Sequence, residues 1–560
     1  MTATRGGASW RPVARTTLGA ALTVAAALLV WVALVAPGPV LGWSLTPLSL
    51  ARVPAEGIVL VAALLALRGA AARWFPVVVG AVLGLLLVVR ILDATFLAVL
   101  RRPFNPLVDW HYAGSAKDLV GSSAGATTAL LATVGAVGLL LALVVLTPLA
   151  VGRLGRLVRR HRTGATRAAV AATGVWVLCA SFGVRLSADL PVASSSAVAV
   201  ATQEVTSVRD GLHDRAVFAD AIRADPFRAT TPADLLTALR GKDVLVVFVE
   251  SYGRVAVDQS PEVARALQAG MTGLDESGYS SRSAWLTSPT FGGISWLAHS
   301  SLQSGLWVNS QLRYDQLLAT ASTDARRLTL ARAFHGAGWR TVDVVPANHQ
   351  DWPEGQAYYG YDKIYDSRSL GYAGASFGYA PVPDQYTLSA FDRLELEPKP
   401  TVRRQPLMAE IDLVTSHAPW APHPQLVDWG RIGNGSLFLD QARTATSRDV
   451  VWRSPAGVRT AYGQTVAYSL DSVVSFLRAT HDDNLVVLML GDHQPISIVS
   501  GDHASHEVPV SIIARDPAVF DRISAWGWEN GLRPGPGAPV WPMDRFRDRF
   551  LTAYSRSAGG

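Results

Sequence analysis

Long apolar runs dominate the first third of the chain, and mixed polar and apolar patterns follow them. Five runs approach the roughly 20 residues that cross a bilayer as a helix, at approximately 16–36, 54–72, 75–98, 124–150 and 167–187. The first run exits through Pro37-Gly38-Pro39, which does not resemble the small-residue cleavage site of a signal peptide. We therefore predict a membrane domain over residues 1–190 with five transmembrane helices, the first of them retained.

Basic residues indicate how these helices are oriented. They gather before the first run, between the second and third, and between the fourth and fifth: Arg5, Arg11, Arg15, Arg68, Arg73, Arg153, Arg156, Arg159, Arg160, Arg162 and Arg167. All three groups fall on one side if the N-terminus is cytoplasmic, as the positive-inside rule requires. The loop 99–120, which carries three basic residues, opposes this orientation but is outnumbered. We expect a multi-pass protein of the cell membrane with everything after about residue 190 outside the cytoplasm.

Arg90 and Asp93 interrupt the third apolar run three residues apart, a spacing that allows contact on one helical face. The simpler interpretation is a structural ion pair near the outer interface. The alternative is a grip on a lipid head group.

Beyond the membrane domain, residues 191–240 have the mixed pattern of a juxtamembrane connector. Continuous apolar runs at 243–249 and 484–491 then predict buried parallel strands, with further strands at 341–345 and 407–414. Helical patterns at 326–337 and 460–478 lie between the strands. Residues 241–560 are therefore predicted to form an α/β domain with a mainly parallel central sheet.

Two of these strands end in side chains that bind metals. Glu250 closes the first apolar run, and Asp492 and His493 close the second. One such carboxylate alone is more typical of a helix cap, but the carboxyl ends of parallel strands share one edge of a sheet. Delivery of all three to that edge favours a site for one divalent ion (Mn²⁺, Zn²⁺ or Mg²⁺).

A nucleophile is expected between these strands, in the hydroxyl-rich stretch 288–305. Gly292 and Gly293 precede Ser295, which is predicted to begin a helix whose N-terminus favours phosphate. A metal-bound serine there would be an activated nucleophile. The alternative is that Ser295 serves only as an N-cap. Thr290 is the second candidate nucleophile.

Composition narrows the function further. The net charge is +6, but many of the arginines flank apolar runs, so we predict no nucleic-acid partner. The single cysteine, Cys179, lies in an apolar run, which excludes both a disulfide framework and a cysteine metal site.

Taken together, these motifs resemble the alkaline phosphatase/sulfatase superfamily, and more closely its membrane-bound lipoteichoic acid synthase and phosphoethanolamine transferase branch. The matching segments are Phe248-Val249-Glu250, Gly491-Asp492-His493, Thr415-Ser416-His417 and Gly360-Tyr361-Asp362. The resemblance implies five N-terminal spans, an extracytoplasmic catalytic domain, and Ser295 at the position of the family nucleophile.

The resemblance also implies the remaining site residues. His417 matches a substrate-site histidine and the expected proton donor, and Trp352 matches an aromatic near the head-group pocket. His349, His503 and His506 are further candidates for substrate contact. By contrast, His299 is predicted to be packing or surface, and Asp412 a structural strand acid.

Two departures from the family pattern limit what is inferred. Pro353 and Glu354 follow Trp352, where lipoteichoic acid synthases carry an arginine that grips glycerophosphate. The sequence after Ser295 lacks the proline and arginine that sulfatases require for formylglycine formation, which argues against a sulfatase.

The function predicted from these features is transfer of a phosphate-ester head group, of phosphoglycerol or phosphoethanolamine type. The donor would be a phospholipid or lipid-linked molecule, and the acceptor a cell-envelope glycan or lipid. The alternatives are a phosphatase or phosphodiesterase that uses water, and a catalytically silent membrane protein that binds the envelope.

Overall fold

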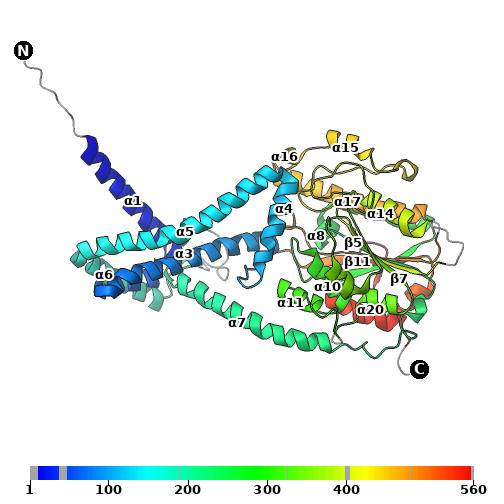
Figure 1. Ribbon diagram of the computed structural model, residues 1–560, viewed down its shortest axis with the longest axis horizontal. Helices are drawn as coiled ribbons and strands as arrows, with labels where there is room; N and C mark the ends of the chain where they lie inside the picture. The colour runs from blue at the N-terminus through cyan, green and yellow to red at the C-terminus, as the bar shows by residue number, and fades with distance from the viewer. Residues whose placement is uncertain are drawn as a thin grey trace, which may run out of the picture. The chain divides into compact units, whose positions relative to one another are not determined.

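The computed structural model describes residues 10–36, 47–187, 190–323, 326–397, 404–480 and 482–556. The chain divides into two compact units (Figure 1). Unit 1 comprises Met1–Ala98, Arg102–Lys117 and Ala126–Gly211, and unit 2 comprises Val99–Arg101, Asp118–Gly125 and Leu212–Gly560.

Helices occupy the five apolar runs of the N-terminal region. They are α1 (Trp10–Val35), α2 (Ala55–Ala66), α3 (Gly69–Leu100), α5 (Ala126–Arg160) and α6 (Arg162–Ser181). Among the described residues, three helical segments are long and apolar enough to cross a membrane: Thr17–Val35, Gly69–Leu100 and Ala126–Arg160.

The other two helices fall short of that standard. The 12 residues of α2 reach only about 18 Å at ~1.5 Å per residue, against a hydrocarbon core of about 30 Å. Helix α6 has 20 residues, but it includes Arg162 and Arg167 and is less apolar. Three spans are supported, and the predicted count of five stays a prediction.

The predicted connector contains more regular structure than its sequence indicated. Strand β4 (Ala193–Ser194) lies in the connector and pairs with β1 (Val53–Pro54) from the N-terminal region. Around the start of the connector, β2 (Arg185–Ser187) pairs with β3 (Leu190–Pro191). Helix α7 (Ser196–Arg223) follows, and turns continue to residue 240. A further helix, α4, spans Tyr112–Ala124.

Unit 2 is built on a nine-stranded sheet in the order β12-β6-β11-β10-β5-β9-β7-β8, with β13 beside β6. Its strands are β5 (Asp243–Val249), β6 (Ser280–Thr287), β7 (Arg340–Val345), β8 (Lys363–Asp366), β9 (Leu407–Leu413), β10 (Leu485–Gly491), β11 (Glu507–Ala514), β12 (Glu529–Asn530) and β13 (Val540–Pro542). Strands β10, β5, β9, β7 and β8 run parallel, whereas β11 is antiparallel to both β10 and β6.

Helices cover both faces of this sheet. Figure 1 shows α14 (Asp384–Phe391) and α17 (Pro455–Ala479) on one face, and α10 (Ser295–Ser304) and α20 (Phe546–Tyr554) on the other. The remaining larger helices of unit 2 are α8 (Arg254–Gln259), α9 (Pro261–Glu276), α11 (Gln311–Leu318), α12 (Leu330–Gly336) and α15 (Phe438–Thr444). The predicted α/β class with a mainly parallel sheet is confirmed.

Strand β5 shows why its sequence is a continuous apolar run. Leu245, Val247 and Val249 belong to the core under α9 and α17. The alternating residues Val244, Val246 and Phe248 belong to the core under α10 and α20. Because side chains alternate along a strand, burial of both faces requires an apolar residue at every position.

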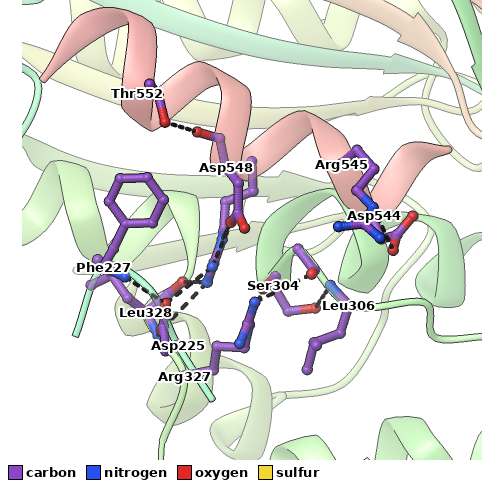
Figure 2. Close-up of polar contacts among 12 residues, drawn as sticks. Asp225, Phe227, Ser304, Leu306, Arg327, Leu328, Asp544, Arg545, Asp548 and Thr552 are labelled. Carbon is purple, nitrogen blue, oxygen red and sulfur yellow. Dashed lines mark hydrogen bonds and ion pairs between the residues drawn. The ribbon is translucent and has the colours of Figure 1, made fainter. Parts of the chain in front are cut away.

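A buried ion network holds the C-terminal end of α10 (Figure 2). Arg327 donates from Nε to the carbonyl of Ser304, the last residue of that helix, at 2.6 Å. The side chain of Arg547 has no exposed surface and pairs with Asp225 at 3.1 Å. Cations near the last carbonyls of a helix satisfy orphan acceptors and complement the helix dipole, so α10 has a fixed end from which its first residue is positioned.

Candidate metal and nucleophile site

The central strands bring the predicted ligands to one edge of the sheet. Strands β5 and β10 are parallel neighbours, with Val249 opposite Gly491, so Glu250 and Asp492 leave the sheet side by side. Strand β6 is antiparallel to β11, which is antiparallel to β10. The loop that follows β6 and leads to Ser295 therefore reaches the same edge.

Glu250, Asp492 and His493 form a compact buried group whose ligand atoms all lie within 4.8 Å of one another. His493 Nε2 lies 3.4 Å from Glu250 Oε1 and 3.4 Å from Asp492 Oδ2. Metal–ligand bonds of about 2.1 Å in tetrahedral geometry place neighbouring ligand atoms about 3.4 Å apart. The spacing of these donors fits a single divalent cation.

Hydrogen bonds fix the orientation of the donors. The His493 ring shares a 2.9 Å bond between Nδ1 and the carbonyl of Gln494, in which Nδ1 is the donor because a carbonyl only accepts. Nε2 is thereby turned toward the two carboxylates. Asp492 Oδ1 accepts from the backbone N–H groups of Ser251 and His493, each at 2.7 Å. Such orientation by a ring's second nitrogen is typical of histidine metal ligands.

Burial and mutual repulsion act differently on the two carboxylates. Burial raises the pKa of Glu250, but His493, His417 and hydrogen bonds from Ser251 and Ser295 outweigh it and lower this pKa to about 2. Burial and the charge of Glu250 raise the pKa of Asp492 to about 6. A bound cation would offset the repulsion between two buried carboxylates.

Ser295 lies at this group and is not an N-cap. Its Oγ donates to Glu250 Oε2 at 3.1 Å and lies 3.2 Å from His493 Nε2. The N-cap position of α10 is Ile294, and no side chain caps this helix end. Ser295 as a residue is only half-buried.

The backbone leading to Ser295 is strained. Ile294 has φ 67°, and Ser251, next to Glu250, has φ 55°. A β-branched residue in the left-handed region is a genuine outlier, and such conformations cost on the order of 1–3 kcal/mol and cluster at functional sites. Gly292 (φ 70°) and Gly293 (φ 152°) make the rest of the turn possible. The fold thus holds Ser295 at the cluster even though Ile294 adopts a backbone conformation that β-branched residues disfavour.

Thr290 does not lie at the cluster. Its backbone N–H donates to Ser288 Oγ at 3.2 Å, and the two hydroxyls are 3.4 Å apart. Ser288 Oγ in turn donates to the carbonyl of Asp492. The structure therefore brings together Glu250, Asp492, His493 and Ser295, whereas the hydroxyl of Thr290 lies beside that of Ser288. The roles of these residues remain predictions.

His417 lies at the same edge, after β9. Its ring stacks on Tyr379 with centroids 3.7 Å apart, and Nδ1 donates to the carbonyl of Ala418 at 2.6 Å. Its charge is one of those that lower the pKa of Glu250. The predicted proton donor is thus near the cluster with Nε2 as its remaining ring nitrogen.

The other predicted substrate residues lie further out. Trp352 is half-buried and packs beside Tyr359 at 5.7 Å. His349 and His503 are exposed. His506 bonds through Nδ1 to the carbonyl of Ser288 at 3.2 Å. None of these four makes a direct contact with the cluster within the described part of the chain, so their substrate roles stay predictions.

A second buried group lies on the α10 side of the sheet. His299 Nδ1 is 3.2 Å from Glu410 Oε1 and 3.5 Å from Asp412 Oδ1, and its ring stacks on Phe248 with centroids 3.7 Å apart. Burial lowers the pKa of His299, but Asp412 and Glu410 outweigh it and raise this pKa to about 9. Burial raises the pKa of Asp412 to about 7 despite the attraction of His299.

Sequence reasoning did not connect these three residues. Two signals were available: His299 follows Ser295 by one helical turn, and Glu410 and Asp412 alternate along one face of β9. Ser251 and Gln494 were also missed, although they orient Glu250 and His493.

Comparisons with known proteins found similar solved structures only. No protein-family model matches the sequence, and no curated protein matches it. The chain is similar to the crystal structure of the lipoteichoic acid synthase LtaP from Listeria monocytogenes, with 15% identity and a TM-score of 0.38, covering 61% of this chain and 78% of that chain.

Two further solved structures are similar. The periplasmic domain of EcEptC from Escherichia coli, in complex with Zn, has 12% identity and a TM-score of 0.37, covering 56% of this chain and 82% of that one. The Streptococcus pyogenes phosphoglycerol transferase GacH, in complex with sn-glycerol-1-phosphate, has 12% identity and a TM-score of 0.33. The match covers 62% of this chain and 91% of that one.

Proposed function

We propose that this protein is a membrane-anchored, metal-dependent transferase that moves a phosphate-ester head group from a lipid donor to a cell-envelope acceptor through a phosphoryl-serine intermediate. The observation that carries the proposal is the convergence of the Ser295 hydroxyl with Glu250 and His493 at 3.1 and 3.2 Å. A hydroxyl held among metal-type ligands, half-exposed and at the start of a helix, has no evident structural purpose.

The first half of the reaction uses groups whose positions are known. Ser295 Oγ attacks phosphorus, the Oγ–P bond forms, and the bond from phosphorus to the lipid alcohol breaks. The proton of the half-buried Ser295 is released to water, and His417, when protonated, gives a proton to the departing alcohol. The amides at the start of α10 face the phosphate oxygens.

A divalent cation held by Glu250, Asp492 and His493 would supply positive charge beside Ser295 Oγ and the phosphate. In the second half, an acceptor hydroxyl attacks the phosphoryl-serine and releases Ser295. Water in place of that hydroxyl would make the same site a phosphodiesterase. The first half-reaction is common to both outcomes.

The proposal includes the predicted organisation of the chain: a membrane domain at 1–190, a connector at 191–240, and a catalytic domain at 241–560 outside the cytoplasm. A lipid donor is consistent with a catalytic domain anchored at the membrane surface. Mn²⁺, Zn²⁺ and Mg²⁺ are all compatible with carboxylate and imidazole donors.

Mass spectrometry of the metal-loaded full chain after incubation with phospholipid vesicles tests the proposal. We expect a covalent phosphoryl adduct on Ser295 that is absent after Ser295→Ala and retained after Thr290→Ala, the matched hydroxyl outside the cluster. Glu250→Gln should lower the bound metal from about one ion per chain, because it removes one charged ligand. An adduct on Thr290, or turnover without any adduct, would overturn the serine mechanism.

A further inference from the structure

A second group of metal-type side chains lies under α10, apart from the cluster at Ser295. His299, Glu410 and Asp412 each offer one ligand atom, and these three atoms all lie within 4.8 Å of one another. His299 Nδ1 is 3.2 Å from Glu410 Oε1 and 3.5 Å from Asp412 Oδ1. Ligand atoms that share a divalent ion at about 2.1 Å in tetrahedral geometry lie about 3.4 Å apart. The spacing of these three residues, which we call the His299 group, therefore fits a cation between them.

The register of the sheet explains why the acids of this group converge. Glu410 and Asp412 alternate along β9, so their side chains project from the same face of the sheet. Their partners in register on β5 are Val246 and Phe248, which belong to the core under α10 and α20. On the other side of β9, strand β7 adds Asp343 in register with Glu410. The strand order thus gathers three carboxylates on the α10 face.

Negative charge exceeds positive charge at this point of the core. Glu410 and Asp412 pair with His299, and, among the residues that the structure describes, none of the three carboxylates pairs with a lysine or an arginine. Asp343 is only 3% exposed and Glu410 only 4%. Burial and the charges of Glu410 and Asp412 raise the pKa of Asp343 well above its usual range. Buried carboxylates in excess of their partners are stabilised by a further cation.

One oxygen of the group has no hydrogen-bond partner. Asp412 Oδ1 is buried and accepts no hydrogen bond, although His299 Nδ1 is 3.5 Å away. A ring nitrogen carries at most one N–H, and Glu410 Oε1 is the nearer acceptor for it. A buried acceptor left unsatisfied costs about 1–3 kcal/mol. A cation at the point shared by the three ligand atoms would contact all of them at once.

Neighbouring side chains orient the ligand atoms. Tyr361 donates its hydroxyl to Glu410 Oε2 at 2.8 Å, and Gln303 Nε2 donates to the same oxygen. Because Oε2 is occupied by these two donors, Oε1 remains for the side of His299. The ring of His299 is held by stacking on Phe248, with centroids 3.7 Å apart. Partners that fix a ligand from behind are typical of metal sites.

The group is also open on one side. The side chains of His299 and Asp412 keep 14% and 16% of their surface exposed, whereas that of Glu410 keeps 5%. A metal site requires a path for the ion to enter, and partial exposure of two of the three ligands provides one. Water reaching the same side would complete the coordination of a bound ion.

We propose that His299, Glu410 and Asp412 hold a second divalent cation, Zn²⁺ or Mn²⁺, the kind of ion that takes imidazole and carboxylate ligands together. The ion would join α10 to β9 and so fix the helix that begins at Ser295. Its affinity should be the lower of the two sites, because three side chains hold it, whereas the first site has Ser295 Oγ beside its three ligands. The second site does not depend on the serine chemistry.

Equilibrium dialysis against buffered Zn²⁺, followed by elemental analysis, counts the bound ions. The full chain is used in detergent, without a polyhistidine tag and after treatment with a chelator. We expect one ion per chain at low free Zn²⁺ and a second as the concentration rises. Asp412→Asn and Glu410→Gln should each weaken binding of the second ion at least about tenfold and leave the first unchanged, because each removes a charged ligand.

Three variants keep the measurement independent of folding defects. Asp412→Asn removes charge from a group with excess negative charge, so without metal it should melt near the wild-type temperature. Tyr361→Phe keeps every ligand but removes the hydrogen bond to Glu410 Oε2, and it should weaken the second ion about tenfold. Asp471→Asn, at a half-buried acid of α17, is the matched control and should bind both ions as the wild type does.

Three results would overturn the second site. They are a single ion in the wild type at saturating Zn²⁺, which would mean that protons alone balance the group, a second ion of unchanged affinity in both Asp412→Asn and Glu410→Gln, and loss of both ions together in Asp412→Asn. Glu250→Gln should lose the first ion and keep the second. A second ion that depends on Asp412, in a chain that forms no adduct on Ser295, supports this site and overturns only the proposed transfer reaction.

Discussion

Replacement of Ser295 by alanine separates a nucleophile from a structural hydroxyl. If Ser295 forms the phosphoryl intermediate, Ser295→Ala removes the atom that attacks phosphorus, and nearly all turnover disappears. If the hydroxyl only supports the fold, turnover per folded molecule survives. The contacts of Ser295 determine how much this substitution should lower the free energy of unfolding.

The expected loss of stability is small. Ser295 occupies the first helical position and caps nothing, so the cost of a lost N-cap does not apply. Its hydroxyl makes one hydrogen bond to a carboxylate, at 3.1 Å, and bonds to charged groups contribute about 1.5–3 kcal/mol. Alanine recovers roughly 0.5 kcal/mol through its higher helix propensity. We therefore expect Ser295→Ala to lower the free energy of unfolding by about 1–2.5 kcal/mol.

The assay is hydrolysis or transfer from a phosphodiester, normalised to the folded fraction measured by circular dichroism. Thr290→Ala is the matched control and should keep its turnover. Ser295→Thr should keep some activity, because the hydroxyl and its reach are preserved. A Ser295→Ala protein that retains more than about a tenth of wild-type turnover, a barrier change of only ~1.4 kcal/mol, refutes the assignment.

Three further predictions follow from other parts of the structure. Asp225→Asn removes one of the two charge partners of the fully buried guanidinium of Arg547 and leaves Asp548 at 2.6 Å. Denaturant unfolding should show a loss of up to about 3–5 kcal/mol, and a smaller loss would mean that Asp548 suffices. The pKa of His299 is raised to about 9, so its positive charge stabilises the fold below that pH and loses effect as the pH rises through 9. The destabilisation caused by His299→Gln should therefore be larger near pH 8, where Asp412 with its pKa of about 7 is also ionised, than near pH 10. A pH-independent difference would assign His299 to packing alone. A reporter fused after residue 200 should be active only outside the cytoplasm, and a cytoplasmic signal would reverse the proposed orientation.

The elements that sequence patterns predicted best are those whose environment is uniform. Strands β5 and β10 are buried on both faces, so their sequences read as unbroken apolar runs, and the side chains that follow them had to meet at one edge. By contrast, β6 (Ser280–Thr287) begins with three serines and an arginine among its first four residues. Its neighbours β12 and β13 are too short to leave a pattern, so the antiparallel side of the sheet was not predicted.

Side-chain groups assembled across elements were harder to predict. Glu410 and Asp412 were individually visible as acids in a strand. Their partner His299 comes from a helix more than 100 positions earlier in the chain. Gln303 of the same helix also bonds to Glu410, across a separation of 107 positions. Ser194 and Ser196 had the polarity of a linker, and only the fold shows them to be buried. Burial of a polar residue depends on tertiary packing, which local composition does not encode.

The pairing of β5 with β10 has a consequence for when this protein becomes competent during its synthesis. The backbone of Ser251 is bonded to Asp492, 241 positions later. Ribosomes synthesise about 5–20 residues per second. Asp492 is therefore added to the chain many seconds after Ser251. An ion present during translation would find only Glu250 and Ser295 of the ligands proposed for the site at β5 and β10. The full proposed set exists only once β10 has been made and has paired with β5. Metal acquisition is therefore expected to be a late, post-synthetic event, and a chain truncated before residue 485 would be unable to hold the ion however much of its sheet had formed.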